Sequence, residues 1–238
     1  MGTEIGIVRV APRYCGPPTS ANGGYVAGLV ARTIGQLVTV RLLRPPLLDT
    51  DLSVQAEADG TWTVTDGEQR LIEARPATID LLPPVPPSYL EAVAASVPDP
   101  DPALHPCPGC YVCGPHRARG DGLRLYAGPV PGRDLVATGW VPDASVGQAD
   151  GQVAPEFIAA ALDCPGFQAL QTGAKPWLLG EYTCRIDRPV RVGEPCVIIG
   201  WKVEIKGRRA MVATALYGED GQCCALTRGT WIEPRPAD

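Results

Sequence analysis

The chain has 238 residues, of which 45% are hydrophobic and 20% charged, as expected of a globular protein with an ordinary core. Its net charge of −5 disfavours a general nucleic-acid-binding protein, and no apolar run is long enough for a membrane-spanning helix. The first residues lack the basic start and long apolar stretch of a secretory signal, so the nine cysteines are expected to be reduced thiols of a cytoplasmic protein.

The first predicted helix covers residues 19–35. Its apolar side chains recur at helical spacing, and Gly35 follows as a stop signal. At its start stand Asn22, Gly23 and Gly24, which can offer backbone N–H groups to a ligand. The alternative interpretation of these three residues is a plain Asn-capped helix start. Residues 39–45 follow the helix and precede a strand-like run rich in β-branched residues.

A proline-rich linker is predicted next. Residues 81–110 hold nine prolines, which rules out a central strand or a long helix because proline fixes φ and lacks an N–H. Within this segment Ser88 and Glu91 have the spacing of a capping box, which predicts one short helix. The linker divides the chain into residues 1–98, with the linker starting at 81, and residues 99–238.

The second long helix is predicted over residues 154–170. Pro155 suits its first turn, and its apolar residues again share one face. This apolar segment carries one acid near its middle, Asp163, two residues before Pro165. A carboxylate there is either a partly solvated helix-end residue or a functional group whose pKa is raised by burial.

The two parts of the chain repeat one pattern. "TVRLLRP" at 39–45 and "TCRIDRP" at 183–189 place Thr39 and Thr183, and the Arg and Pro residues after them, at identical spacing. Each part also has an Asp-Gly turn before a last strand, at 65–69 and at 219–223. Each part therefore reads as one helix followed by an antiparallel meander, in which the helix covers the apolar face of the sheet.

This arrangement resembles the double hot-dog fold of acyl-CoA thioesterases. The segment "CYVCGPHRARGDGLRLY" at 110–126 is similar to the start of phenylacetate-pathway-type thioesterases, residues 188–231 resemble their closing strands, and residues 21–31 resemble their helix start. The resemblance implies an α+β protein of two fused hot-dog units, each an antiparallel sheet wrapped around one central helix, with the sheets joined edge to edge. It also implies a homodimer.

The implied activity is hydrolysis of an acyl-CoA thioester, with Asp163 as nucleophile or general base. The family usually has a glycine N–H donor eight residues before the acid, where this chain has Pro155, which has no N–H to donate. Glu156 can supply its own N–H at the substrate, and Asn22, Gly23 and Gly24 are the other candidate donors. Because the acid and these last three donors come from different halves of the chain, one hypothesis is a composite catalytic site formed between the halves. The alternative is a non-enzymatic acyl-CoA or lipid binder with a degenerate site.

Two further groups of residues are candidates for binding. Lys206, Arg208 and Arg209 lie on a predicted hairpin turn and are candidates for the phosphates of CoA, or else a solvated hairpin tip. Cys107, Cys110 and Cys113 raise the alternative of a zinc-stabilised interaction module, with the flanking residues His105 and His116. The resemblance implies no metal, and no cofactor apart from the CoA of the substrate.

Overall fold

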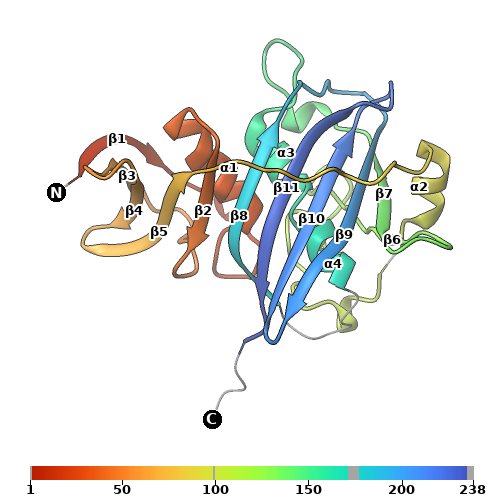
Figure 1. Cartoon of the computed structure of the whole chain (residues 1–238), viewed down its shortest axis with the longest axis horizontal. Helices are drawn as coiled ribbons and strands as arrows, with labels where there is room; N and C mark the ends of the chain where they lie inside the picture. The colour runs from red at the N-terminus through yellow and green to blue at the C-terminus, as the bar shows by residue number, and fades with distance from the viewer. Residues whose placement is uncertain (1, 99, 171–176, 235–238) are drawn as a thin grey trace.

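The computed structural model describes residues 2–98, 100–170 and 177–234. Its central feature is one antiparallel sheet of eleven strands in the order β1-β3-β4-β5-β2-β8-β11-β10-β9-β7-β6 (Figure 1). The strands of the first part are β1 Thr3–Val8, β2 Val38–Leu42, β3 Leu52–Ala56, β4 Trp62–Asp66 and β5 Gln69–Pro76. Those of the second part are β6 Gly128–Pro129, β7 Val136–Trp140, β8 Leu178–Ile186, β9 Cys196–Lys206, β10 Arg209–Tyr217 and β11 Cys223–Ile232.

The two parts of the sheet meet where β2 pairs with β8. In this antiparallel pair Thr39 lies directly opposite Thr183, and their buried hydroxyl oxygens are 2.7 Å apart. The two threonines that head the sequence repeat are therefore neighbours across the junction. Both predicted Asp-Gly turns are confirmed, since Gly67 and Gly221 take positive φ between β4 and β5 and between β10 and β11.

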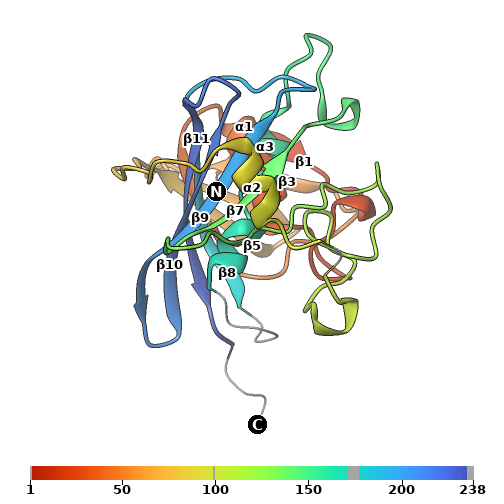
Figure 2. The same ribbon diagram turned by 90° about the vertical axis from the view of Figure 1, so that its right-hand side faces the viewer.

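Three helices lie on one face of this sheet: α1 Gly23–Ile34, α3 Pro155–Ala161 and α4 Cys164–Leu170 (Figure 2). Helix α1 packs on β1, β2 and β8, α4 packs on β7, β9 and β10, and α1 and α3 lie against each other. The predicted stop of α1 is confirmed, because Gly35 adopts the left-handed conformation with φ of 79°.

The single helix expected over 154–170 is wrong. The chain forms two helices, α3 and α4, separated by Leu162 and Asp163. Pro165 is the cause, because in a continuous helix its ring would clash with the carbonyl of Ala161 and its missing N–H would leave that carbonyl unbonded. In the first turn of α4 the same proline costs no hydrogen bond. Asp163 therefore occupies a helix break and not a helix interior.

The proline-rich segment runs along the other face of the sheet. It carries the short helix α2, Tyr89–Ala95, whose predicted capping box between Ser88 and Glu91 is confirmed. Tyr217 on β10 donates its hydroxyl hydrogen to the carbonyl of Pro84 at 2.7 Å, and Arg185 on β8 donates to the carbonyl of Ile79 at 2.8 Å. We call residues 77–98 the strap. Beneath it lies a second apolar core, which includes Ile199, Ala215 and Leu226.

The remaining helical elements are single 3₁₀ turns at Pro12–Tyr14, Pro102–Leu104 and Ala144–Val146. Among the described residues, no helix has the length and apolar character that crossing a membrane requires.

Candidate functional site

Asp163 lies in the interior, where the break between α3 and α4 meets the start of α1. Only 3% of its surface is exposed. Its Oδ2 accepts two hydrogen bonds of 2.9 Å, one from the side-chain Nδ2 of Asn22 and one from the backbone N–H of Gly24. Its Oδ1 is buried and has no hydrogen-bond partner among the described residues. One carboxylate oxygen is thus held in place while the other is left for a further contact.

The start of α1 explains why these donors point at the acid. Asn22 is the N-cap, and its Oδ1 accepts from the N–H of Tyr25 at 2.9 Å, which leaves its NH₂ group to donate to Asp163. Gly24 permits the close approach of the helices, since a Cβ on it would lie 2.6 Å from the carbonyl oxygen of Ala159. The sequence therefore brings the donors of one half and the acid of the other together.

The charge state of Asp163 is set by its burial. Loss of water raises the pKa of its carboxyl from 3.8 to about 7, although the hydrogen bonds from Gly24 and Asn22 act in the opposite direction. A carboxyl with a pKa near neutrality can both accept and release a proton under physiological conditions. This is the property that a general base requires.

The residues predicted to donate an N–H to the substrate do not all lie in the same surroundings. Asn22 and Gly24 donate to Asp163 itself, whereas Gly23 packs towards β8, where an added Cβ would lie 2.8 Å from Leu179. Glu156, seven residues before the acid, is buried, and its Oε1 lies 2.6 Å from the half-exposed Arg32 on α1. Its charge is therefore partly compensated, while its Oε2 has no partner among the described residues.

An aromatic cluster that sequence analysis did not predict packs beside these residues. Tyr14, Tyr25, Tyr111 and Phe157 place their ring centroids 4.4–6.4 Å apart. The four rings come from four separate segments, so no local spacing could have indicated the cluster. It supplies much of the apolar surroundings of the α1 start.

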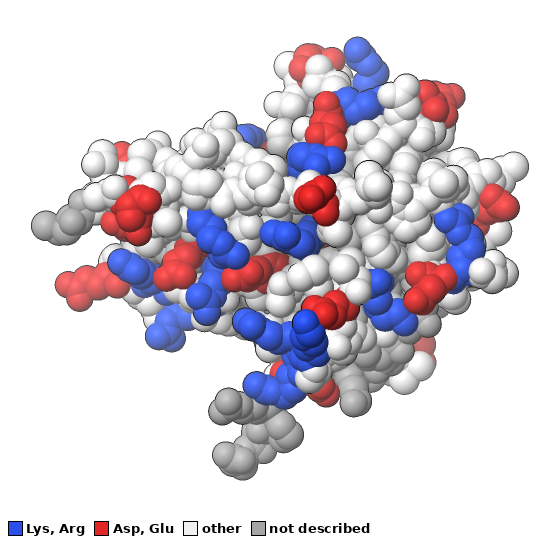
Figure 3. Space-filling view, viewed as in Figure 1, with Lys and Arg blue, Asp and Glu red and all other residues white. Residues whose placement is uncertain are grey.

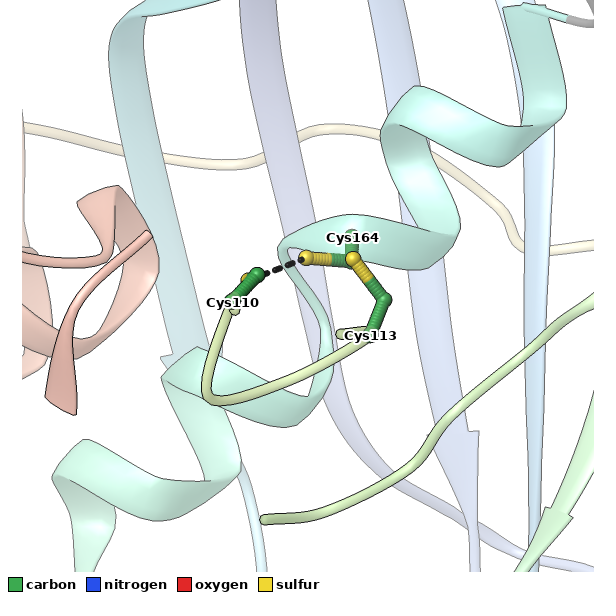
Figure 4. A group of neighbouring side chains, drawn as sticks. All are labelled: Cys110, Cys113 and Cys164. Atoms are coloured by element: carbon green, nitrogen blue, oxygen red, sulfur yellow. Dashed lines mark hydrogen bonds between the residues drawn. The ribbon is translucent and has the colours of Figure 1, made fainter. Parts of the chain in front are cut away.

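The cysteine cluster differs from the expected one. Cys110 and Cys113 lie close together, but the third sulfur is that of Cys164, the residue after Asp163, and these three sulfurs lie within 4.8 Å of one another (Figure 4). Cys107 is not part of this group; its backbone N–H donates instead to Nδ1 of His105. The set of Cys107, Cys110 and Cys113 is therefore not assembled as one site.

The basic turn is not close to the acid. Lys206 and Arg209 flank the turn between β9 and β10, while Thr214, further along β10, donates to the carbonyl of Leu162 at 2.8 Å. Five residues of strand, about 17 Å, separate Arg209 from Thr214. Lys206 pairs with Glu204 at 2.7 Å, and Arg208 donates to the carbonyl of Glu233. Basic and acidic side chains alternate over this face of the molecule (Figure 3).

Two surface cavities lie elsewhere. One of 630 Å³ is lined by residues around Arg188, Glu194 and Asp220, and one of 520 Å³ by residues of β4, β5 and the preceding turn. Neither includes Asp163, which is closed to solvent in this conformation. A ligand that reaches Asp163 must therefore displace part of its surroundings.

Comparisons with known proteins support the fold. The sequence matches no protein-family model and no curated protein. Among solved structures, the chain is similar to the tesB protein of Mycobacterium avium subspecies paratuberculosis, with a TM-score of 0.63 at 12% identity, covering 96% of this chain and 92% of that one.

It is also similar to a conserved protein of unknown function with a hot dog fold from Alicyclobacillus acidocaldarius, with a TM-score of 0.61 at 12% identity, covering 97% and 93%. These likenesses extend over nearly the whole chain, and at this identity they show the fold and not the activity. The predicted hot-dog fold is thus confirmed.

Proposed function

We propose that this hot-dog protein hydrolyses an acyl-CoA thioester and that Asp163 is its general base. The observation that carries the proposal is the state of the Asp163 carboxylate, in which Oδ2 is held by Asn22 and Gly24 while the buried Oδ1 has no partner among the described residues. A pKa of about 7 suits such a group to proton transfer at neutral pH.

In the proposed reaction, Oδ1 takes a proton from a water molecule as the water oxygen attacks the thioester carbonyl carbon. The C–S bond then breaks, the departing CoA sulfur takes the proton from Asp163, and CoA and the carboxylic acid are released. The oxyanion that forms at the carbonyl needs N–H donors. Gly23 is the candidate, because the N–H at the first position of a helix has no acceptor within that helix. Pro155 cannot take this role.

The same site supports a second candidate function, a non-enzymatic acyl-CoA or lipid binder. The observation that favours it is the closure of the site: Asp163 is only 3% exposed, and Pro155 stands where the family has a donor. In such a protein Lys206, Arg208 and Arg209 hold the phosphates of CoA and no turnover follows.

The proposal includes the organisation of the chain. It assigns residues 1–98 and 99–238 to two hot-dog units that share the sheet across β2 and β8, and it assigns two copies of the chain to a homodimer in the cytoplasm that works without a cofactor. The edge-to-edge pairing of Thr39 with Thr183 supports the two-unit assignment. Sedimentation equilibrium tests the dimer, and a mass of 25.1 kDa, that of one chain, contradicts it.

Assays of acyl-CoA hydrolysis and of acyl-CoA binding distinguish the proposed thioesterase from the proposed binder. The purified chain is offered a panel of short, long and aromatic acyl-CoA esters, and released thiol is measured; turnover of some member is the expected result. If no ester is hydrolysed but CoA esters raise the unfolding temperature, the binder is the correct function. If neither occurs, both proposals are wrong.

A further inference from the structure

Three buried thiols from distant parts of the chain converge beside Asp163. Cys110 and Cys113 come from the loop after the strap, and Cys164 is the first residue of α4 (Figure 4). All three are buried, and the sulfurs of Cys110 and Cys164 are 3.7 Å apart, too far for a disulfide. The proposed hydrolysis uses none of them.

The separation of these sulfurs fits a metal ion. A tetrahedral zinc site with Zn–S bonds of about 2.3 Å holds its sulfurs about 3.8 Å apart. The observed 3.7 Å between Cys110 and Cys164 matches this value, and Cys113 lies within 4.8 Å of both. An ion can therefore reach all three sulfurs with movements of about 1 Å.

The Cys-x-x-Cys turn is closed by a hydrogen bond of 2.8 Å from the backbone N–H of Gly114 to the carbonyl of Cys110. Gly114 lets the turn close, since a Cβ there would lie 2.4 Å from the carbonyl oxygen of Cys110.

We propose that Cys110, Cys113 and Cys164 bind one Zn²⁺ ion as thiolates. Three buried thiolates need compensating charge, and a divalent ion offsets more of it than a monovalent one. The fourth position of the tetrahedron is left for a water molecule. The ion ties the 110–113 turn to the start of α4 and so fixes the helix break that carries Asp163.

Metal analysis tests this site. The full chain, purified under reducing conditions without a metal-binding tag, is expected to contain about one zinc per chain. Removal of zinc by a chelator lowers the unfolding temperature, and one equivalent of Zn²⁺ restores it. Cys164→Ser abolishes this binding, whereas Cys223→Ser, which alters a cysteine of β11 outside the cluster, leaves it unchanged.

Cobalt decides the question without any variant. Titration of the metal-free wild type with Co²⁺ is expected to give thiolate-to-cobalt charge-transfer absorption and tetrahedral visible bands that saturate at one ion per chain. Fewer than one zinc per five chains after reconstitution, together with no cobalt–thiolate band, overturns the proposal. Metal content is measured independently of hydrolysis. If the chain binds zinc but hydrolyses no ester, only the proposed function is wrong. If the chain is active but binds no metal, only the proposed zinc site is wrong.

Discussion

At the scale of single residues, burial and hydrogen bonding compete at Asp163. The two N–H donors hold Oδ2 in place, but removal of the carboxyl from water has the larger effect on its pKa. The uncompensated oxygen is costly in a folded core, because a buried acceptor without a donor loses its hydration and gains no replacement. Such a cost at one defined atom is typical of a functional group.

This cost predicts how stability depends on pH. The pKa of Asp163 is about 7 in the folded chain and near 3.8 when it is unfolded, so between these values the folded chain binds more protons than the unfolded one. Its contribution to the free energy of unfolding therefore falls as pH rises from about 4 to 7, by about 4 kcal/mol, and is constant above that range.

Urea unfolding of the wild type and of Asp163→Asn at pH values from 4.5 to 8.5 measures this effect. The amide does not ionise, so the difference in stability between variant and wild type should move in favour of the variant as the pH rises. A difference that is constant over the whole range would show that Asp163 titrates normally.

At the scale of secondary-structure elements, the contact between α1 and α3 brings the site together. Gly28 lies in this contact, where an added Cβ would be 2.6 Å from Cα of Glu156. We expect Gly28→Ala to lower the free energy of unfolding by about 1–3 kcal/mol, because backbone atoms cannot move aside easily and the gain in helix propensity is only about 1 kcal/mol.

Chemical denaturation checks this value. Gly109→Ala is the matched control, since its Cβ would meet no atom within 4 Å, and it should change stability little. Equal stability of the two variants would mean that the helices are less tightly packed than described.

The junction of β2 and β8 allows a second prediction at this scale. Among the residues that the structure describes, the hydroxyls of Thr39 and Thr183 bond only to each other. Thr39→Val therefore leaves a buried hydroxyl on Thr183 without its partner, at a cost of about 1–3 kcal/mol. Thr39→Val with Thr183→Val should cost less than the sum of the single changes. Thr39→Ser keeps the hydroxyl as a control, and strict additivity in the double-mutant cycle would contradict the pairing.

Local patterns predicted these elements well, but not their contacts. The stop at Gly35, the capping box of Ser88 and Glu91 and both Asp-Gly turns depend on neighbours within a few residues, and all are confirmed. The hydrogen bond from Asn22 to Asp163 joins residues 141 apart, and the Cys110–Cys164 contact joins residues 54 apart. Such contacts are set by how α3, α4 and the loop pack, which one sequence does not record.

At the scale of the whole molecule, the strap connects the two parts of the chain across the outer face of the sheet. Tyr217→Phe removes the hydroxyl that bonds the carbonyl of Pro84, and we expect it to cost about 1 kcal/mol and to speed proteolysis within the strap. Tyr89→Phe is the control, because the hydroxyl of Tyr89 makes no hydrogen bond among the described residues. Unchanged cleavage in both variants would show that the strap is held by its apolar contacts alone.

The enclosed position of Asp163 also affects the molecule as a whole. The acid lies between α1, α3 and α4, so the proposed hydrolysis requires these elements to separate locally before a thioester can reach it. Under that proposal, opening is part of the catalytic cycle. We expect tight packing at this contact to protect the acid from water between turnovers.

The most direct test of the account is the turnover of the best acyl-CoA substrate by the wild type and by Asp163→Asn, with circular dichroism to show that both are folded. If Asp163 is the general base, the amide should lower kcat by about 100-fold or more, and wild-type kcat should rise with pH through an apparent pKa near 7. A folded Asp163→Asn chain that retains wild-type kcat would contradict the central claim.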